Sequence, residues 1–501
     1  MLREPNGVDD TAPALARAVL DYAARDDRFS LDKKIYGQYF QLYFQRLMLL
    51  MPRLNEAVAS QWPGVPTAKV LDLKEGEECV IMGTLYKEMK LKPCILDEYT
   101  KEVGLGSEVG SGKFVSDDDS VVLEDEGARV KLRGRAVLVP HLVTGVVMAC
   151  KGRVVQGGEF EADEVCFPAA APQRSVVPSS SGNTAGAQQG GEEPPKYVAL
   201  MSGLGVGDPA ACSPIKLELM LDYVTGNLGG TREQANAASI VRLVIAGGAL
   251  PEVDVPATSL DPKQQAAVAR PLRELDVLLT QLAASVPVDL MPGEGDPTNQ
   301  ALPQQPLHPC MFPEAARYAP GTFTACTNPH DFSVGGVDFL GTSGQNISNL
   351  CKYTNVRGTE TAAAAAGGAE GAKAEGIGAG ANAEGVGAAA AAAGGGGGGD
   401  VLGPEEQLDL MEATLRWQHM APSAPDTLAC YPYKDRDPFY LENCPHVYFA
   451  GNQPKFGARL VEVGGGKTLA VSVPSFAKTG TIVLVNVNTL ECHSMTFGDD
   501  N

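Results

Sequence analysis

The sequence is poor in the residues that build metal centres and in stretches that could cross a membrane. Its 501 residues include only six histidines, and no two of its eleven cysteines stand in a CxxC pair. An odd number of widely spaced cysteines argues against a disulfide framework or a structural zinc site, so we expect reduced, buried thiols. No uninterrupted apolar run approaches the roughly 18 residues that a membrane helix needs.

Basic residues are scarce relative to acidic ones. Forty Lys and Arg face 61 Asp and Glu, which gives a formal net charge of -21. Phosphate binding takes clustered Lys and Arg, so this balance disfavours wrapping a nucleic acid by long-range attraction. The start, MLREPNGVDD, lacks the basic-then-apolar layout of a signal peptide. We therefore expect a cytosolic or nuclear protein.

The length of the chain predicts two or three domains. The first predicted element is a long amphipathic helix over residues 30–58. Cap-type residues, Ser30 and Asp32, precede apolar side chains at helical spacing: Ile35, Tyr39, Tyr43, Leu47, Leu50 and Leu54. Arg46 and Arg53 interrupt this apolar density. Their charges favour a helix that packs against protein over one that enters a membrane.

Short runs rich in Val, Ile and Met predict strands across residues 68–170. Their spacing, with glycine and acidic loops between them, is typical of a small barrel or sandwich, and residues 109–120 are expected to form an exposed loop. Residues 171–195 hold almost nothing that could pack, so we expect a flexible linker and a domain boundary there.

Strands and helices alternate across residues 196–501, which predicts layered α/β structure. The apolar runs 197–202 and 243–248 each meet a glycine turn, and Leu272, Leu275, Leu279 and Leu282 share one helical face. An Ala/Gly-rich tract at about 357–403 cannot bury enough surface to offset its ordering entropy, so we expect a disordered insertion.

Three glycine clusters invite comparison with nucleotide-binding motifs. SGLGVGD (202–208) does not fit GxGxxG, VGGGKT (463–468) lacks the first glycine of a P-loop and is better explained as a hairpin turn, and GNQPKFG (451–457) matches neither. His330 and Asp331 could ligate a metal, but without a second cluster we expect a solvated loop. No GxSxG motif is present, and residue by residue we predict no catalytic residue and no cofactor.

Several long strings resemble one known family. They occupy residues 290–299 (LMPGEGDPTN), 302–313, 337–348, 421–433, 437–457 and 471–486. These strings are similar to the small (B) subunits of the eukaryotic replicative DNA polymerases alpha, delta and epsilon. The resemblance implies an OB-fold barrel over 68–170 and an inactivated calcineurin-like phosphoesterase domain of layered α/β/β/α type over 196–501. It also implies that segment 1–67 packs on that second domain.

In active phosphoesterases related to this family, Asp, His and Asn at strand ends hold two metal ions that activate water. The resemblance places other residues at those positions: Gly203 and Gly205 in DxH, Gly248 in GD, Glu294 and Gly295 in GNHD, Ser343 in HG, and Asn452 and Pro454 in GHxH. Of the ligands in the third motif only Asp296 remains. Glycine and proline offer no side-chain donor, so we expect no metal pair and no hydrolysis.

The resemblance implies a non-catalytic scaffold subunit of a replicative DNA polymerase in the nucleus. Such a subunit joins the cysteine-rich C-terminal region of the catalytic subunit to a third, regulatory subunit during DNA replication and repair synthesis. It contacts DNA only through the complex and has no membrane role. The sequence does not locate the partner-binding residues.

Two alternative functions stay open at this point. The first is a residual metal-dependent phosphodiesterase or exonuclease, which would need the ligands that the five motifs lack. The second is a single-stranded DNA-binding OB fold, for which the barrel region offers basic residues (Lys131, Arg133, Arg135, Lys151 and Arg153) but few aromatics (Tyr86, Tyr99, Phe114 and Phe160). Those charges are better explained as a solvated strand face.

Overall fold

The computed structural model describes residues 16–31, 37–93, 112–175, 194–208, 210, 212–251, 262–355 and 404–498. Two predicted features, the Ala/Gly-rich tract and most of the expected linker, lie outside these residues, as does Tyr99. The first residues of the expected linker are held in place: Ala171 is buried, and Gln173 Nε2 donates to the carbonyls of Pro445 (3.1 Å) and Lys467 (2.7 Å).

Five antiparallel and parallel strands close into a barrel in the order β2-β3-β4-β6-β5. The strands are β2 (Glu78–Glu88), β3 (Ser120–Glu124), β4 (Arg129–Arg133), β5 (Val147–Val154) and β6 (Phe160–Cys166). Alternate side chains of β3 and β4 are buried, as expected for strands with one face on a core. The predicted small barrel is confirmed, although the sequence patterns missed β3.

The other strands of the described chain form two six-stranded sheets. The first has the order β1 (Tyr22–Ala24), β11 (His330–Val334), β12 (Val337–Thr342), β13 (Val447–Gln453), β15 (Gly466–Pro474) and β14 (Gly457–Val463). The second has the order β10 (Phe323–Ala325), β9 (Val288–Met291), β8 (Ile240–Ala246), β7 (Tyr197–Met201), β16 (Thr481–Asn486) and β17 (Cys492–Thr496). The VGGGKT segment forms the hairpin turn between β14 and β15, as predicted.

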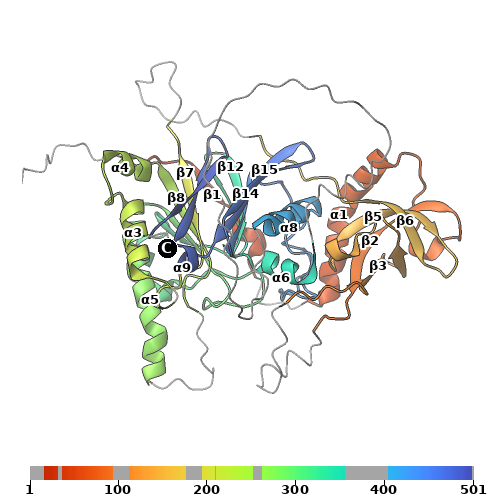
Figure 1. Cartoon of the computed structure of the whole chain (residues 1–501), viewed down its shortest axis with the longest axis horizontal. Helices are drawn as coiled ribbons and strands as arrows, with labels where there is room; N and C mark the ends of the chain where they lie inside the picture. The colour runs from red at the N-terminus through yellow and green to blue at the C-terminus, as the bar shows by residue number, and fades with distance from the viewer. Residues whose placement is uncertain are drawn as a thin grey trace, which may run out of the picture.

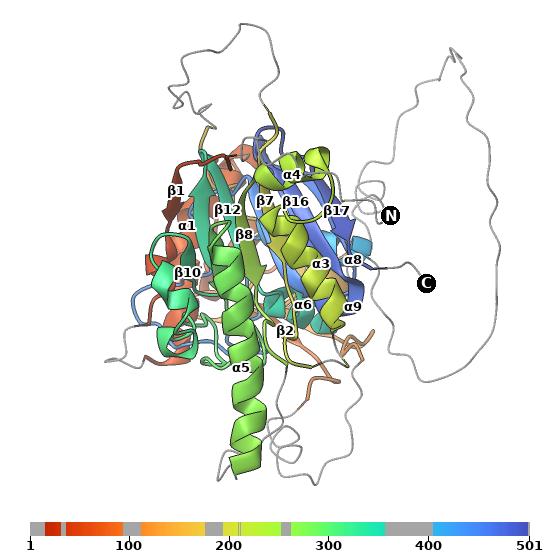
Figure 2. The same cartoon turned by 90° about the vertical axis from the view of Figure 1, so that its left-hand side faces the viewer.

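The two sheets pack face to face and carry helices on their outer faces. Val198, Val244, Phe339, Phe449 and Val471 belong to the apolar core between the sheets. The second sheet is covered by α3 (Pro214–Thr225), α4 (Thr231–Ala238) and α5 (Pro262–Ala283), as Figure 2 shows. The first is covered by α6 (Gln345–Tyr353) and α8 (Pro404–Arg416), and a short α9 (Phe476–Thr479) follows β15. The predicted α/β layering is therefore present.

Helix α1 (Tyr39–Gln61) lies between the barrel and the two-sheet region (Figure 1). The prediction that it begins near Ser30 is wrong. Ser30 is extended and follows the 3-10 turn η1 (Asp26–Phe29), and the helix is capped by Gln38, whose backbone N–H donates to Gln41 Oε1. The chain before it is pinned, because the Gly37 N–H donates to the Pro432 carbonyl at 3.1 Å.

The buried face of α1 also differs from the predicted one. Leu47, Leu50 and Leu54 pack on barrel residues of β2 and β5, but Tyr39 is exposed. Arg46, expected to interrupt the apolar face, is fully buried. Its guanidinium donates to Asp437 Oδ2 (2.8 Å) and to the carbonyls of Gly145, Pro422 and Ala424. The helix therefore packs on the barrel as well as on the two-sheet region.

No helix in the described part of the chain is long and apolar enough to cross a membrane. The ten described cysteines are all free, and most are buried, as the sequence predicts.

Candidate functional site

The ends of strands β7, β8, β12 and β13 bring four of the predicted ligand positions together. A β-carbon at Gly248 would lie 2.7 Å from Asn452 Oδ1 and 3.0 Å from Gly203 Cα. Asn452 Nδ2 donates to the Ser343 carbonyl at 2.9 Å. Residues from distant parts of the sequence thus meet at one place.

The side chains of Ser475 and Asn452, together with neighbouring backbone, crowd the space beside Gly203 and Gly248. The Gly203 N–H donates to the Gly247 carbonyl (2.8 Å) and the Gly205 N–H to the Gly248 carbonyl (3.2 Å). Gly203 (φ 60°) and Gly248 (φ 67°) adopt the left-handed conformation that favours glycine. A β-carbon at Gly203 would lie 2.5 Å from Ser475 Oγ. A side chain at Gly203 would therefore be crowded unless Ser475 and Asn452 moved.

The one acidic ligand that remains, Asp296, is saturated by backbone donors. Its carboxylate accepts N–H groups of Gly248 (2.9 Å), Ala249 (3.4 Å), Leu250 (3.1 Å) and Gly293 (2.8 Å). Burial raises its pKa to about 6, and the four N–H groups oppose that rise. Asp296 thus joins the turns after β8 and β9. Its neighbours Glu294 and Gly295, like Pro454, are exposed and stand outside the cluster.

A network of side-chain amides, which sequence reasoning missed, occupies the adjoining space. Asn328 Nδ2 lies 2.8 Å from Gln304 Oε1, 2.8 Å from Ser343 Oγ and 2.7 Å from Gln345 Oε1. Gln304 Nε2 donates to the Gly293 carbonyl at 3.0 Å. Both Gln304 and Asn328 are buried. Gln304 and Asn328 stand in proline-containing segments, and no motif in the sequence marks them.

The donors at these strand ends do not fit a two-metal centre. The described residues there present amides, a hydroxyl and one carboxylate that already accepts four hydrogen bonds. Two divalent cations need several carboxylate or imidazole ligands, and of these only the carboxylates balance charge. This arrangement can rigidify the junction of the two sheets.

The barrel does not present a basic groove lined with aromatics among its described residues. Lys131 and Arg133 pair with Glu159, and Lys151 pairs with Glu164 at 2.7 Å. Three of the four aromatics named above are described by the structure. Phe160 is fully buried and Phe114 packs on Tyr353, whereas Tyr86 is exposed. Arg135 and Arg153 are exposed. This pairing agrees with a solvated strand face.

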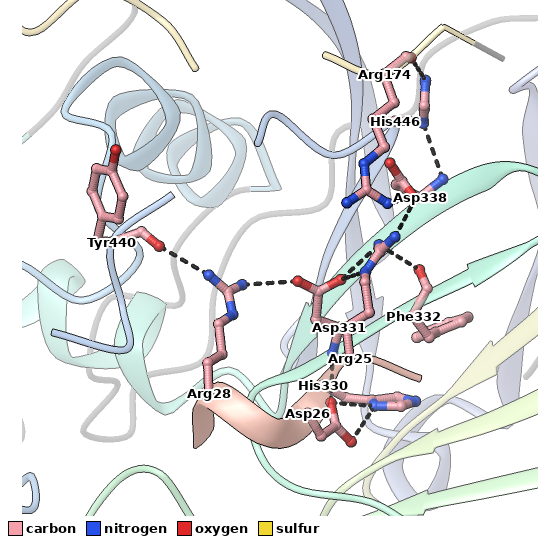
Figure 3. Close-up of polar contacts among 10 residues, drawn as sticks. All are labelled: Arg25, Asp26, Arg28, Arg174, His330, Asp331, Phe332, Asp338, Tyr440 and His446. Atoms are coloured by element: carbon pink, nitrogen blue, oxygen red, sulfur yellow. Dashed lines mark hydrogen bonds and ion pairs between the residues drawn. The ribbon is translucent and has the colours of Figure 1, made fainter. Parts of the chain in front are cut away.

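A second polar cluster joins the N-terminal segment to β11 and β12 (Figure 3). Arg25 bridges Asp331 and Asp338, both at 2.7 Å, and Arg28 reaches Asp331 at 3.0 Å. The prediction that His330 and Asp331 form a solvated loop is wrong. His330 is fully buried in β11, where its Nδ1 lies 2.8 Å from Asp26 Oδ2. Its partner stands 304 residues away in the sequence, so no local pattern could reveal it.

Family models and curated relatives place the whole chain in one family. The model that describes the B subunits of DNA polymerases alpha and epsilon matches residues 198–458, and the model of the DNA polymerase delta subunit OB-fold domain matches residues 38–165. The DNA polymerase delta small subunit of Arabidopsis thaliana is 41% identical over 95% of each chain. The corresponding subunit of Oryza sativa is 38% identical over 96% of this chain and 99% of its own length.

This chain belongs to the DNA polymerase delta small-subunit family. The relationship extends beyond plants, since the small subunit of Saccharomyces cerevisiae is 32% identical over 92% of this chain and 90% of its own length. The family resemblance found in the sequence strings is thereby confirmed. In this delta small-subunit member, the OB-fold match includes α1 together with the five barrel strands. That extent agrees with the packing of Leu47, Leu50 and Leu54 on the barrel.

Proposed function

We propose that this chain is a non-catalytic scaffold subunit of a delta-like replicative DNA polymerase, acting in the nucleus in DNA replication and repair synthesis. The observation that carries the proposal is the closed cluster of Gly203, Gly248, Ser343 and Asn452 in a member of the delta small-subunit family. A domain whose former ligand positions are closed in this way would keep a rigid surface without a catalytic metal pair.

The two-sheet region is proposed to be an inactivated calcineurin-like phosphoesterase domain over residues 196–501. Its two face-to-face sheets with helices outside, and the glycine turns at the ends of β7 and β8, support this assignment. The OB fold over 68–170, with α1 packed on it, would be the second rigid body. Residues 171–195 would connect the two.

An apolar surface on α1 supports a role in protein assembly. Phe40, Phe44 and Met48 recur at every fourth residue and are 69%, 50% and 47% exposed. Beside them, between α1 and the barrel, lies a groove of about 460 Å³ that Tyr86 and Leu47 help to line. Contiguous exposed apolar side chains on a soluble protein mark sites that another protein covers. We propose that this α1 face contacts a polymerase subunit.

The proposed partners are the cysteine-rich C-terminal region of a polymerase catalytic subunit and a third, regulatory subunit. Co-expression of the full chain with a delta catalytic subunit, followed by size exclusion, tests the assembly. We expect one co-eluting complex at salt concentrations that dissociate nonspecific ionic contacts. Separate elution of two folded proteins would contradict the scaffold role.

The α1 surface can be tested in the same experiment. The double substitution Phe40→Asp and Phe44→Asp should leave the lone chain folded, since both side chains are exposed. It should lower the amount of co-eluting complex at least tenfold. Val277→Asp on α5, also exposed, is the matched control and should co-elute as the unsubstituted chain does. Equal loss with both variants would argue against a specific contact through α1.

The absence of hydrolysis has its own test. The purified chain should show no Mn²⁺-dependent turnover of a phosphodiester above the level of a protein-free control. Turnover that depends on Asp296 and Asn452 would favour the phosphodiesterase alternative. Steeply salt-dependent binding of single-stranded DNA by the lone chain would favour the OB-fold alternative.

A further inference from the structure

A buried cluster outside the strand-end site brings together three different metal-ligating side chains. Asp26 in η1, Cys326 after β10 and His330 at the start of β11 each place one donor atom so that all three lie within 4.8 Å of one another. β10 belongs to one sheet and β11 to the other, while η1 follows the edge strand β1. The cluster thus joins three separate parts of the chain.

The cluster is shielded from solvent. His330 is 0% and Cys326 2% exposed, and the Asp26 side chain is 19% exposed. The Cys326 thiol contacts the Thr324 carbonyl at 3.7 Å and also interacts with the His330 imidazole. His330 is held in place, because its ring stacks on Phe332 with the centroids 4.5 Å apart. The three donors therefore lie close together without an ion.

The other side of the imidazole carries the independent observation. His330 Nε2 lies 3.6 Å from Asp289 Oδ2, which is too long for a hydrogen bond. Both atoms are buried, and apart from this long ion pair neither has a hydrogen-bond partner in the described chain; the Tyr22 hydroxyl also has none there. Buried polar groups without partners cost free energy, and they are rare in native proteins. A bound ligand that shifts the imidazole by a few tenths of an ångström would bring His330 Nε2 within hydrogen-bond distance of Asp289 Oδ2.

A zinc ion on the Asp26 side of the ring would do so. Metal-bound histidines typically donate their second ring N–H to a carboxylate, which fixes the tautomer. Asp289 stands at that second nitrogen, and its other oxygen is held by Arg242 at 2.5 Å. An ion about 2.1 Å from each of two donors separates them by roughly 3.3 Å. The Asp26 and Nδ1 atoms, now 2.8 Å apart, would therefore move apart by about half an ångström.

The charges also balance for a buried site. On binding, the Cys326 thiol would release its proton to solvent and coordinate as the thiolate, without any change in oxidation state. The Asp26 carboxylate and the thiolate then neutralise the two charges of the ion, and Asp289 pairs with Arg242. One nitrogen, one sulfur and one oxygen donor form a set that suits zinc better than magnesium or calcium.

We propose that Asp26, Cys326 and His330 form a zinc site that fastens the β1–η1 segment to both sheets, with Asp289 as the positioning residue for the imidazole. The site is separate from the strand-end cluster and independent of polymerase assembly. It would stabilise the fold and would have no catalytic function.

Metal analysis of the full chain, purified alone with any affinity tag removed, tests the site. We expect about one zinc per chain after dialysis, and less than a fifth of that in the variants Cys326→Ser and His330→Gln. Cys310→Ser, which alters an exposed cysteine elsewhere, is the matched control and should keep its zinc. Zinc-free unsubstituted protein that also binds none when Zn²⁺ is added, or zinc retained in both variants, would overturn the proposal.

A second measurement does not depend on the variants folding. The chain stripped with chelator should gain at least 5 °C in Tm on addition of one equivalent of Zn²⁺. Replacement by Co²⁺ should produce a thiolate-to-cobalt charge-transfer absorption. An unchanged Tm together with no such absorption would count equally against the site. Because both readouts use the lone chain, their failure would leave the co-elution test of the scaffold role unaffected.

Discussion

Arg46 shows how a single buried charge connects three parts of the molecule. From α1 it donates to Gly145 beside the barrel and to Pro422, Ala424 and Asp437 of the segment after α8. Every bond has a carboxylate or a backbone carbonyl as its acceptor. A buried ion pair contributes little by itself, but the loss of one partner leaves the other charge uncompensated.

We therefore expect Arg46→Met to lower the free energy of unfolding by about 3–5 kcal/mol. The exposed pair Arg270–Glu274 provides the control, since Arg270→Met should cost less than about 1 kcal/mol. Urea denaturation followed by circular dichroism measures both. A cost for Arg46→Met as small as that of the control would show that the buried network is not important for stability.

His419, beside the same Asp437, should make stability depend on pH. Burial, with the nearby Arg46 charge, lowers its pKa to about 4 although its Nε2 lies 2.9 Å from Asp437 Oδ2. The folded protein then binds fewer protons than the unfolded chain between about pH 6.5 and pH 4. Stability from this group is present above pH 6.5 and is lost as the pH falls through that window, by about 3 kcal/mol.

The pH effect must be measured as a difference, because Asp296 acts in the opposite direction. Its raised pKa means that the folded state binds more protons, so its own contribution grows as the pH falls from about 6. We expect His419→Gln to be less stable at pH 7 and to lose less further stability between pH 6.5 and 4. Parallel stability curves for the variant and the unsubstituted chain would refute the assignment.

At the scale of elements, the glycine turns decide what the strand ends can do. Gly203 after β7 and Gly465 in the β14–β15 hairpin both have positive φ, 60° and 86°. They differ in their surroundings: a β-carbon at Gly203 would meet Ser475 Oγ and Asn452 Oδ1, whereas one at Gly465 would meet nothing within 4 Å. This contrast separates backbone strain from crowding.

Gly465→Ala should cost about 1 kcal/mol, from the left-handed conformation alone. Gly203→Ala should cost about 2–5 kcal/mol, because overpacking adds to the same strain. Thermal unfolding of the two variants gives the comparison. Similar costs would mean that the strand ends can relax enough to admit a side chain, which would weaken the argument that ligands cannot fit there.

Local patterns predicted elements better than they predicted contacts. Short apolar runs predict four of the five barrel strands, though not β3, and helical spacing predicts the buried face of α5, where Leu275, Leu279 and Leu282 are buried. The start of α1 was misplaced because Ser30 resembles a cap, while the real start depends on the contact of Gly37 with Pro432. His330 was misassigned for a similar reason, since Asp26 and Asp289 reach it only in the folded chain.

The candidate strand-end site could be located only through the family resemblance. Gly203, Gly248, Ser343 and Asn452 share no residue type or spacing that composition or periodicity would detect. Their convergence comes from the parallel pairing of β7 with β8 and of β12 with β13. Glu294 and Pro454 were assigned by the same resemblance, but in the fold they are exposed and outside the cluster.

At the scale of the whole molecule, the barrel and the two-sheet region share one hydrophobic core. A single cluster includes Ile81, Leu85 and Phe160 of the barrel together with Leu350 of α6 and Tyr448 of β13. Apolar side chains that pack across a boundary lose their burial when either side unfolds. The two regions should therefore stabilise each other.

We expect the full chain to unfold in one calorimetric transition. A fragment of residues 37–175, which keeps α1 and the barrel, should unfold at least 10 °C lower or fail to fold, because it exposes that shared cluster. Two well-separated transitions in the full chain, or a fragment as stable as the whole, would show that the regions are energetically independent.

The edge strand β1 has a consequence for how the protein is made. Tyr22 pairs with Val334 and Ala24 with Phe332, so β1 is synthesised well before its partner, which lies more than 300 residues downstream. At about 5–20 residues per second, that delay is roughly 15–60 s. During this time the nascent segment has no sheet to join. The pairing of β1 with β11 is therefore a late step of folding, and β1 stays unpaired with β11 until then.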